Sequence, residues 1–571
     1  MVTMRDGVAL ATDVYRPAGT SALPAIVQRT PYDKEFSALR NYSFEVMRAV
    51  QGGYACVVQD VRGRYLSQGH FDPFFDDGAD GADTVAWVAA QPWCSGTVGM
   101  AGGSYFGATQ WRAASERPDA LRAVIPYVTA ADYHEGWAYQ GGAFELGFNL
   151  NWTLSFLAIG EVLRRLVAGH DATGQLQELV AAIDDNDALY RRRPLNDVPL
   201  LSELAPYYLK WLEHPDYDDY WSAVAPKERY GEMTVPALNI GGWYDLFLGG
   251  TIANYLGMKR HGATPAARRP RLVIGPWAHG DSVGWFAQRS YGFLSNYLAL
   301  DPTALHLRWF DHYLKGVENG AGEDPPVQIF VMGIDAWRDE RDWPLPDTSY
   351  TRYYLHSQGH ANTAAGDGVL SPEPPDEQPH DTYLYDPRNP VPTLGGATFL
   401  PGLFVAANAG PLDQRPLAGR ADVLTYATAP LEHDVEVTGP VELVLFASST
   451  ANDTDFTGKL IDLHPDGRAE ILTDGILRAR YRDSMSDPKP LEPNKVYELR
   501  IDLWATANVF RAGHRIRLDV SSSNFPRFDA NTNTGGTIAS EGRDDGVEAV
   551  NRVFHDRSHP SHVVLPIIDR R

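Results

Sequence analysis

The stretch VGMAGGSYFG, Val98–Gly107, places three glycines around one serine directly after a short apolar run. Glycine in the path of a strand costs conformational entropy, so such a cluster marks a backbone that turns tightly or is approached closely. A strand-like TVGMAG precedes Ser104 and a helix-like GATQWRAASE follows it. This is the context of a nucleophilic serine at a strand-to-helix turn, although a serine in a structural turn would leave the same signature.

Candidate partners for Ser104 follow it in the order Asp, His that α/β-hydrolases use. Asp245 comes directly after PALNIGGWY, and His279 comes directly after RLVIGPWA. Reactive groups of open α/β sheets gather beyond the carboxyl ends of the strands, so we expect these three side chains to meet as nucleophile, orienting acid and base. Among the other histidines that follow Asp245, His261 lies in a basic stretch, and His306 and His312 lie in an expected helix.

An acyl-transfer transition state also needs fixed donors for its oxyanion. The backbone N–H of Tyr105, directly after the serine, is one candidate. The loop after an earlier strand normally supplies the second donor, but here that loop reads RTPYDK, with no glycine run. Pro31 has no N–H, which leaves the hydroxyl of Tyr32 as the second candidate. From the residues alone, a tyrosine of the core is the favoured interpretation of Tyr32.

The wider pattern predicts two kinds of domain. Short apolar strands alternate with helices in the first part of the chain, which indicates a parallel sheet covered on both faces. A helical segment interrupts this pattern, and the last third is rich in strands. Residues 497–503 and 515–520 alternate apolar and charged side chains, which predicts half-buried antiparallel strands of a β-sandwich. We expect domain segments at 1–132, 133–227 (helical cap), 228–347 and 348–571.

The acidic stretch DPFFDDGADGAD, residues 72–83, does not have the ligand spacing of an EF-hand. We interpret it as a solvated loop that leads into a helix over Asp77–Trp93, with Asp80 or Asp83 as the capping residue. Asp60, which also ends an apolar strand, is interpreted as structural, paired with Arg62 or Arg64. We expect no metal site and no cofactor.

Bulk properties narrow the class of protein further. The 571 residues carry 50 basic and 73 acidic side chains, a net charge of −23, which argues against nucleic acid or an anionic membrane as partner. The two cysteines are too few for a disulfide framework, and we expect both to be buried thiols. No apolar leader or membrane span is visible, which favours a cytoplasmic protein. Edge strands of the sandwich would allow pairing of two copies into a homodimer.

Several segments in collinear order resemble the bacterial cocaine esterase family, the CocE/NonD serine hydrolases, which are related to X-prolyl dipeptidyl peptidases and α-amino-acid ester hydrolases. The matching stretches cover nearly the whole chain, the helical segment least well: TPYDK, GYACVVQDVRGRYLSQGHF, ADTVAWVAAQPWCSGTVGMAGGSYFGATQW, PALNIGGWYDLF, LVIGPWAHG, VMGIDAWRDERDWPLPDT, TYLYDPRNPVPTLGG and VSSSNFPRFDANTNTGG. The resemblance implies an α/β-hydrolase domain with an inserted helical cap and a C-terminal jelly-roll.

The resemblance also implies roles for individual residues. It places the catalytic triad on Ser104, Asp245 and His279, and the oxyanion donors on Tyr32 and Tyr105. Aromatic side chains of the family hold the acyl group of a small ester. Their counterparts here are Trp137, Trp152 and Phe247, with Phe399 and Leu400 of the stretch GGATFLPGLF as further members. The expected reaction is hydrolysis of an ester with a hydrophobic, aromatic acyl group through an acyl-enzyme.

Two alternatives stay open at this point. Relatives act on amides, as β-lactam acylases or aminopeptidases, and an aminopeptidase needs carboxylates beside the substrate to hold its ammonium group. Asp132, Glu135 and Glu145 lie near the presumed entrance of the cap. The jelly-roll would also suit a carbohydrate-binding protein with an inactive hydrolase domain.

Overall fold

The parallel strands expected in the first part of the chain form one nine-stranded sheet, in the order β13-β12-β11-β10-β7-β6-β4-β5-β3. The computed structural model describes residues 1–19, 21–41, 44–400 and 408–570. Only the two edge strands of this sheet run antiparallel to their neighbours. Its strands are β3 (Thr12–Tyr15), β4 (Leu23–Thr30), β5 (Ala55–Asp60), β6 (Cys94–Gly103), β7 (Leu121–Tyr127), β10 (Leu238–Tyr244), β11 (Arg271–Ala278), β12 (Val327–Val331) and β13 (Ala336–Glu340).

Helices cover both faces of this sheet, which is why β5, β10 and β11 are buried along their whole length. One face packs against α2 (Val46–Gln51) and α13 (Pro302–Lys315). The other face packs against α3 (Asp77–Ala89), α4 (Tyr105–Ser115) and α12 (Leu248–His261). The carboxyl ends of β6, β10 and β11 therefore lie at one edge of the sheet, each followed by a residue that the sequence singles out.

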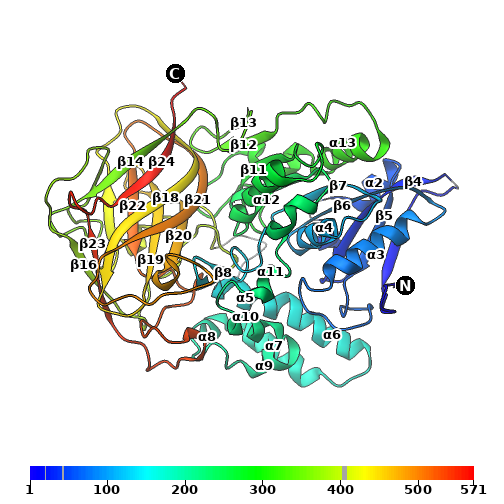
Figure 1. Ribbon diagram of the computed structural model, residues 1–571, viewed down its shortest axis with the longest axis horizontal. Coiled ribbons are helices and arrows are strands. Elements are labelled where there is room, and N and C mark those ends of the chain that lie inside the picture. The colour runs from blue at the N-terminus through cyan, green and yellow to red at the C-terminus, as the bar shows by residue number, and fades with distance from the viewer. Residues whose placement is uncertain (20, 42–43, 401–407, 571) are drawn as a thin grey trace.

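A helical segment is inserted between β7 and β10, below the sheet in Figure 1. Its elements are β8 (Tyr139–Gln140), β9 (Ala143–Phe144), α5 (Leu146–Trp152), the π-helix η1 (Thr153–Ala158), α6 (Ile159–Val167), α7 (Thr173–Asp184), α8 (Asn186–Tyr190), α9 (Pro199–Leu204), α10 (Tyr207–Glu213) and α11 (Asp219–Ser222). The segment is rich in aromatic residues, and it shares one apolar cluster with Tyr32, Phe247 and Phe399.

The C-terminal part forms an eleven-stranded, mostly antiparallel sheet, seen as the other lobe in Figure 1. Its strands are β14 (Thr348–His356), β15 (Val369–Ser371), β16 (Asp381–Tyr385), β17 (Leu424–Ala427), β18 (Val435–Ser449), β19 (Asp455–Leu463), β20 (Ala469–Arg478), β21 (Tyr497–Phe510), β22 (Arg515–Ser521), β23 (Ala549–Phe554) and β24 (His562–Ile568). The α/β domain, the helical insertion and this β-domain confirm the predicted fold class. The domain limits themselves stay predictions.

Short elements complete the chain: β1 (Val2–Thr3), β2 (Ala9–Leu10), α1 (Ser37–Arg40), and the 3₁₀ turns η2 (Pro226–Glu232), η3 (Phe293–Ser295), η4 (Tyr297–Leu300), η6 (Arg415–Leu417), η7 (Ala479–Tyr481) and η8 (Ile538–Ser540). Both cysteines are buried free thiols, as expected. Across the described residues, no helix combines the length and apolarity that crossing a bilayer would need.

The alternation predicted for the C-terminal strands is confirmed in β21 but wrong in most of β22. In β21, Leu499 and Ile501 are buried while the charged residues between them are exposed. In β22 the charged residues are buried as well, because Arg517 and Asp519 neutralise each other through two hydrogen bonds of 2.7 and 2.8 Å. An ion pair within one strand thus hides the charges that the sequence pattern assigned to a solvent-facing side.

The acidic stretch of residues 72–83 is not a solvated loop, and this prediction was wrong, because residues 77–83 already belong to α3. Asp77 and Asp80 are 5% and 1% exposed. Asp80 does not cap the helix but accepts two hydrogen bonds from Arg62, at 2.6 and 3.0 Å, while Arg29 lies beside it at 3.9 Å. The guanidinium groups of Arg29, which is fully buried, and of Arg62, which is largely buried, therefore hold these carboxylates inside the domain. The pattern missed this because the arginines lie on other strands and loops.

The neighbouring acids also differ from expectation. Asp83 makes an ion pair with Arg5 instead of a cap. Asp60 does not pair with Arg62 or Arg64. Its carboxylate accepts a hydrogen bond from the backbone N–H of Lys34, and burial raises the pKa of Asp60 to about 7. Asp60 therefore orders the loop that carries Tyr32.

Asp80→Asn should lower the free energy of unfolding of the α/β domain by about 3–5 kcal/mol, because the buried cations Arg29 and Arg62 lose a counter-charge. Asp83→Asn in the same helix is the matched control. Its partner Arg5 is 56% exposed, so the loss should stay below about 1 kcal/mol. Urea denaturation followed by circular dichroism measures both, and equal losses would contradict the assignment.

Candidate active site

Ser104 lies at the sharp turn between β6 and α4, with backbone angles φ +59° and ψ −124°. A non-glycine residue with positive φ is strained, at a cost of about 1–3 kcal/mol. The turn is held by the Ser104 N–H, which donates to Tyr127 O at 2.9 Å, and by its carbonyl, which accepts from Gly107 and Ala108. The strain points the serine side chain out of the sheet edge instead of along the strand.

The glycines around Ser104 are required by close packing. A Cβ on Gly102, which has φ +135°, would lie 2.6 Å from Cβ of Phe106. A Cβ on Gly103 would lie 2.9 Å from the Tyr127 ring, and one on Gly107 would lie 2.8 Å from Thr129. All three distances are shorter than real Cβ contacts. The glycines around Ser104 therefore allow the tight turn that directs the serine side chain out of the sheet edge.

The structure brings Ser104, His279 and Asp245 into one hydrogen-bonded chain. His279 follows β11 and Asp245 follows β10, two adjacent strands of the sheet. Asp245 is fully buried, and its Oδ2 accepts from Nδ1 of His279 at 2.8 Å while Oδ1 accepts from the Phe247 N–H at 2.7 Å. This fixes the proton on Nδ1, so that Nε2 of His279 is the acceptor facing Ser104 Oγ at 3.1 Å.

Tyr32, on the loop after β4, is the fourth sequence-predicted residue that reaches this place. Its hydroxyl accepts a hydrogen bond from Nε1 of Trp152 at 2.9 Å and also interacts with the Ser104 side chain. Tyr32 is 7% exposed, and burial raises the pKa of its phenol well above the ordinary value. The hydroxyl therefore keeps its proton at neutral pH and can donate it to an acceptor beside Ser104.

Tyr105 begins α4, where backbone N–H groups have no intrahelical partner. Its side chain points into the core instead. The phenol donates to Oδ2 of Asp77 at 2.6 Å and accepts from the N–H of Phe74 at 2.9 Å. The ring of Tyr105 thus anchors the first turn of α4, directly after Ser104.

Aromatic rings from three parts of the chain surround His279. Phe247 lies with its ring edge-on to the imidazole, 5.1 Å between centroids, and it stacks on Trp137 at 4.4 Å. Phe399 of the C-terminal part lies 5.0 Å from the imidazole, and Leu400 beside it is buried in the same cluster. Residues 401–404 of the GGATFLPGLF stretch lie outside the described residues.

Sequence reasoning missed two further rings, Phe148 and Phe156. Phe148 contacts Phe247 and Phe399, each at 5.5 Å, and stacks on Trp152. Phe156 packs edge-on against Tyr32 at 5.7 Å. These two phenylalanines lie four residues before and four after Trp152, which places all three on one face of a helix. That spacing was a visible signal in the sequence.

The three acids that would suit an aminopeptidase all have partners inside the protein. Asp132 is paired with Lys227. Glu135 accepts hydrogen bonds from the N–H of Gly141, and burial raises the pKa of this carboxyl to about 8. Glu145 lies 3.5 Å from Arg527, which also binds Asp474. These carboxylates are therefore committed to structural contacts.

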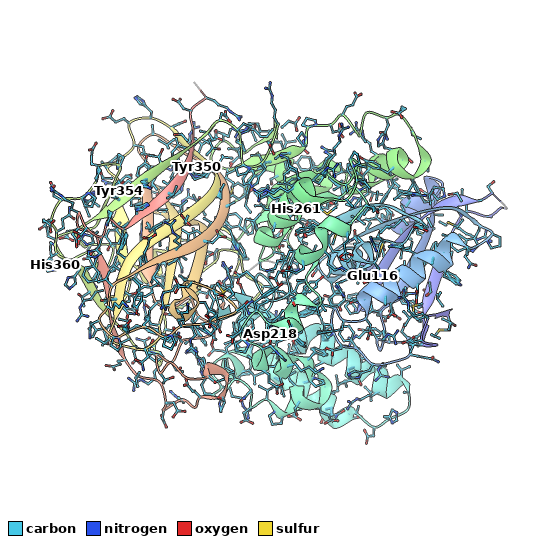
Figure 2. The ribbon with its side chains drawn as sticks, viewed as in Figure 1. Glu116, Asp218, His261, Tyr350, Tyr354 and His360 are labelled. Carbon is cyan, nitrogen blue, oxygen red and sulfur yellow. The ribbon has the colours of Figure 1, made fainter. Side chains whose placement is uncertain are left out.

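The remaining candidate histidines lie elsewhere. His261 is exposed at the end of α12, where Figure 2 labels it. His306 is buried within α13 and bonds to Pro302 O at 2.7 Å, and His312 bonds to Val317 O. Within the described ranges, side chains spaced to ligate a metal are grouped at one place, in the C-terminal β-domain and outside this site.

Known protein families match almost the whole chain. The family profile of the X-Pro dipeptidyl-peptidase (S15 family) matches residues 6–281, and that of the X-Pro dipeptidyl-peptidase C-terminal non-catalytic domain matches residues 319–564. The cocaine esterase of Rhodococcus sp. (strain MB1 Bresler) is 44% identical over 573 residues, which cover 100% of this chain and 98% of that protein.

Two solved structures share the complete architecture. An aminopeptidase from the marine sediment archaeon Thaumarchaeota archaeon superposes with a TM-score of 0.82 at 28% identity, covering 100% of this chain and 96% of that chain. An α-amino acid ester hydrolase superposes with a TM-score of 0.80 at 27% identity, covering 99% and 95%.

The fold and these likenesses define a serine hydrolase with an inserted helical cap and a C-terminal β-domain. Within that class, the family is decided by the 44% identity to the Rhodococcus cocaine esterase, which covers 100% of this chain. The chain belongs to the CocE/NonD family of serine esterases, related to the X-Pro dipeptidyl peptidases, and a small ester is the substrate that this membership implies.

Proposed function

We propose that this esterase hydrolyses esters of aromatic carboxylic acids through an acyl-enzyme on Ser104. The observation that carries the proposal is the unbroken hydrogen-bonded chain from Asp245 through His279 to Ser104, set among aromatic rings. A serine hydroxyl is a weak nucleophile unless an adjacent base removes its proton. Here the base lies at hydrogen-bonding distance and is itself oriented by a buried carboxylate.

In the proposed mechanism, Ser104 Oγ attacks the ester carbonyl while Nε2 of His279 takes the serine proton. The imidazolium that forms is stabilised by Asp245, which holds the ring through Nδ1. His279 then protonates the alcohol as it leaves. A water molecule, deprotonated by the same nitrogen, cleaves the acyl-enzyme and releases the acid.

The oxyanion of the tetrahedral intermediate is assigned to two donors, the backbone N–H of Tyr105 and the hydroxyl of Tyr32. The direction of the Trp152 hydrogen bond supports the second assignment. Since the indole N–H donates to the Tyr32 oxygen, the proton of that hydroxyl is left to point at another acceptor. Trp152, expected as a wall of the acyl pocket, therefore acts as a positioning residue for Tyr32.

The acyl group is assigned to the space walled by Trp137, Phe148, Phe247, Phe399 and Leu400. Aromatic rings prefer edge-on or offset contacts with one another, and such pairs are worth about 0.5–1.5 kcal/mol beyond the area that they bury. Phe247 and Phe399 both contact the His279 imidazole. The aryl group of a bound ester, bonded to the carbonyl carbon, would make further edge-on or offset contacts with these rings. The Rhodococcus relative is a cocaine esterase, which agrees with such a substrate class.

Hydrolysis of aminoacyl amides is the weaker candidate. It would need a free carboxylate beside the substrate to pair with an ammonium group, whereas Asp132, Glu135 and Glu145 already have partners. This candidate is tested as well, because an aminopeptidase and an α-amino acid ester hydrolase are among the similar structures. The homodimer and the cytoplasmic location expected from the sequence stay predictions.

An acyl series of p-nitrophenyl esters tests the substrate class. The benzoate should show a higher kcat/KM than the acetate, because its ring replaces water against Phe247 and Phe399. Phe247→Ala should remove most of this preference while leaving the acetate rate less affected. A preference for aminoacyl p-nitroanilides over every ester would contradict the proposal and favour the amidase.

Ser104→Ala tests whether the domain is catalytic at all. A fluorophosphonate probe should label the intact protein at this serine, because the probe needs an activated hydroxyl, and it should leave the variant unlabelled. The matched control is Ser115→Ala, at the other end of α4, where the hydroxyl only bonds to Trp111 O. Absence of labelling in the intact protein would instead favour a carbohydrate-binding protein with an inactive hydrolase domain.

Trp152→Phe tests the positioning of Tyr32. It removes one hydrogen bond and keeps an aromatic ring, so kcat should fall about fivefold, corresponding to about 1 kcal/mol. Tyr32→Phe removes the donor itself and should cost about a hundredfold, roughly 3 kcal/mol. Trp309→Phe in α13 is the control, because that buried indole N–H has no hydrogen-bond partner among the described residues. A parental kcat in Trp152→Phe would refute the positioning role.

A further inference from the structure

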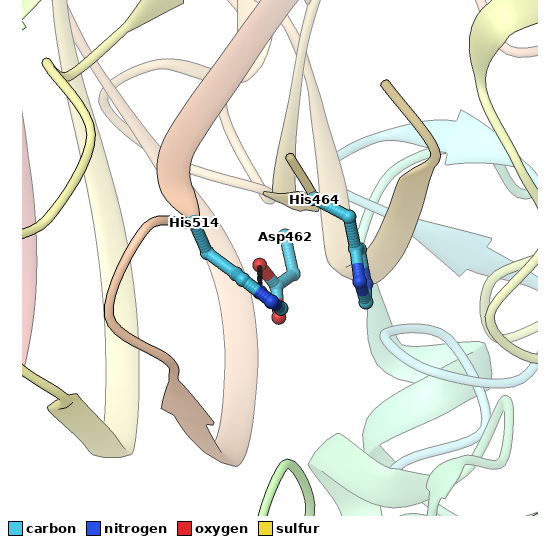
Figure 3. Close-up of side chains that lie close together, drawn as sticks. All are labelled: Asp462, His464 and His514. Carbon is cyan, nitrogen blue, oxygen red and sulfur yellow. Dashed lines mark hydrogen bonds and ion pairs between the residues drawn. The ribbon is translucent and has the colours of Figure 1, made fainter. Parts of the chain in front are cut away.

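A second group of chemically active side chains lies in the C-terminal β-domain and has no part in the proposed mechanism. It consists of Asp462 on β19, His464 in the turn that follows, Glu470 on β20 and His514 directly before β22. Figure 3 shows the Asp462 carboxylate against the His514 imidazole, with the His464 ring beside them. We call these four residues the His–carboxylate cluster.

Strand register brings the cluster together. Asp462 is paired with Glu470 across β19 and β20, and with Ile516 across β19 and β22. Side chains alternate between the two faces of a sheet with a period of two. His464, two residues after Asp462, and His514, two residues before Ile516, therefore project to the same face as the two carboxylates. The convergence is a consequence of pairing between three adjacent strands.

The ligand atoms of Asp462, His464 and His514 lie close enough together to share one ion, and Glu470 lies beside His464. Oδ1 of Asp462 lies 2.8 Å from Nδ1 of His514, and Oε2 of Glu470 lies 3.3 Å from Nε2 of His464. Asp462, His464 and His514 each place a ligand atom within 4.8 Å of the others. Four ligands held tetrahedrally at about 2.0–2.2 Å from a zinc ion lie about 3.3 Å apart.

The two carboxylates of the cluster are buried, its two imidazoles are half-buried, and one ring nitrogen lacks a hydrogen-bond partner among the described residues. Asp462 and Glu470 are 4% and 6% exposed. Nε2 of His464 is buried and has no hydrogen-bond partner among the described residues, because its approach to Glu470 does not have hydrogen-bond geometry. Two carboxylates side by side in a buried place also repel each other unless a cation lies between them.

Arg468 lies in the turn between β19 and β20. Within the part of the chain that the structure describes, it is the one arginine or lysine in contact with the cluster. Its guanidinium donates to Glu470 and to Nδ1 of His464, the latter at 3.0 Å. The Arg468 side chain is 29% exposed and belongs to a surface turn. It can therefore leave for solvent when another cation arrives, which frees His464 to carry its proton on Nδ1 and to ligate through Nε2.

We propose that the His–carboxylate cluster is a site for a divalent transition-metal ion of the zinc type, ligated by Asp462, His464 and His514, with Glu470 as a neighbouring counter-charge. Two imidazoles and one carboxylate are a donor set that suits zinc, and a water molecule would fill the fourth position. The two carboxylates balance the charge of the ion. Arg468 is the competitor that occupies part of the site without metal.

The place of the cluster indicates what the ion would stabilise. Glu470 forms a β-bridge with Asp413, and the N–H of Asp413 donates to the Gln288 side chain of the α/β domain at 2.8 Å. Gln288 lies on the segment that follows His279. The ion would thus fix the β19–β20 hairpin to β22 at the point where the β-domain touches a loop next to the active site.

Zinc binding to the full-length chain tests the proposal. Chelator-treated protein should take up one equivalent of zinc chloride that survives desalting, measured by atomic emission, and its melting temperature should rise. The double variant Asp462→Asn/His514→Gln should lose this equivalent. His433→Gln, which replaces an exposed histidine of the same domain, should keep it. Equal zinc contents in the double variant and the control, or none in the parent, would overturn the proposal.

Arg468→Gln gives an independent test that keeps every ligand and so does not depend on the folding of the double variant. If the arginine competes with the ion, its removal should tighten zinc binding at least about tenfold in a titration against a chelating dye. Unchanged or weaker zinc binding would overturn the proposed competition between Arg468 and the ion.

Discussion

The strained backbone of Ser104 is the constraint on which the rest of the active site depends. Its positive φ turns β6 into α4 within one residue and lifts the hydroxyl above the edge of the sheet, where β10 and β11 deliver Asp245 and His279. The neighbouring glycines exist because the turn leaves no room for a Cβ. Strain of this size persists only where the surroundings over-determine it, and here the parallel sheet and its helices supply that rigidity.

Much of this site could be predicted from the sequence because its parts obey local rules. Ser104, Asp245 and His279 each follow an apolar strand, and a parallel sheet places such strand ends together. Phe148 could also have been predicted, because it lies one helical turn before Trp152 and therefore on the same helix face. The family resemblance, however, indicated only the tryptophans of the helical segment. The direction of the Trp152 hydrogen bond could not be predicted, since it depends on how two separate segments pack.

Two of the wrong predictions have one physical cause in common. Asp80 and Asp519 were assigned to solvent because single-sequence patterns treat a charge as exposed. Both are buried against arginines, one from a distant loop and one two residues away in the same strand. Burial of a charge is decided by whether a counter-ion reaches it, which is a property of the tertiary structure. The His–carboxylate cluster escaped notice for the same reason, because its members are brought together by strand register.

Phe399 belongs to the C-terminal part of the chain and yet lies against the catalytic imidazole. The two halves of the protein therefore contribute differently to the site. The nine-stranded sheet must keep its geometry for the reaction to occur, whereas the Phe399 ring belongs to no strand of that sheet and can be replaced without changing it. Diversification of this family toward new acids can accordingly proceed by altering the appended module, leaving the reactive machinery untouched.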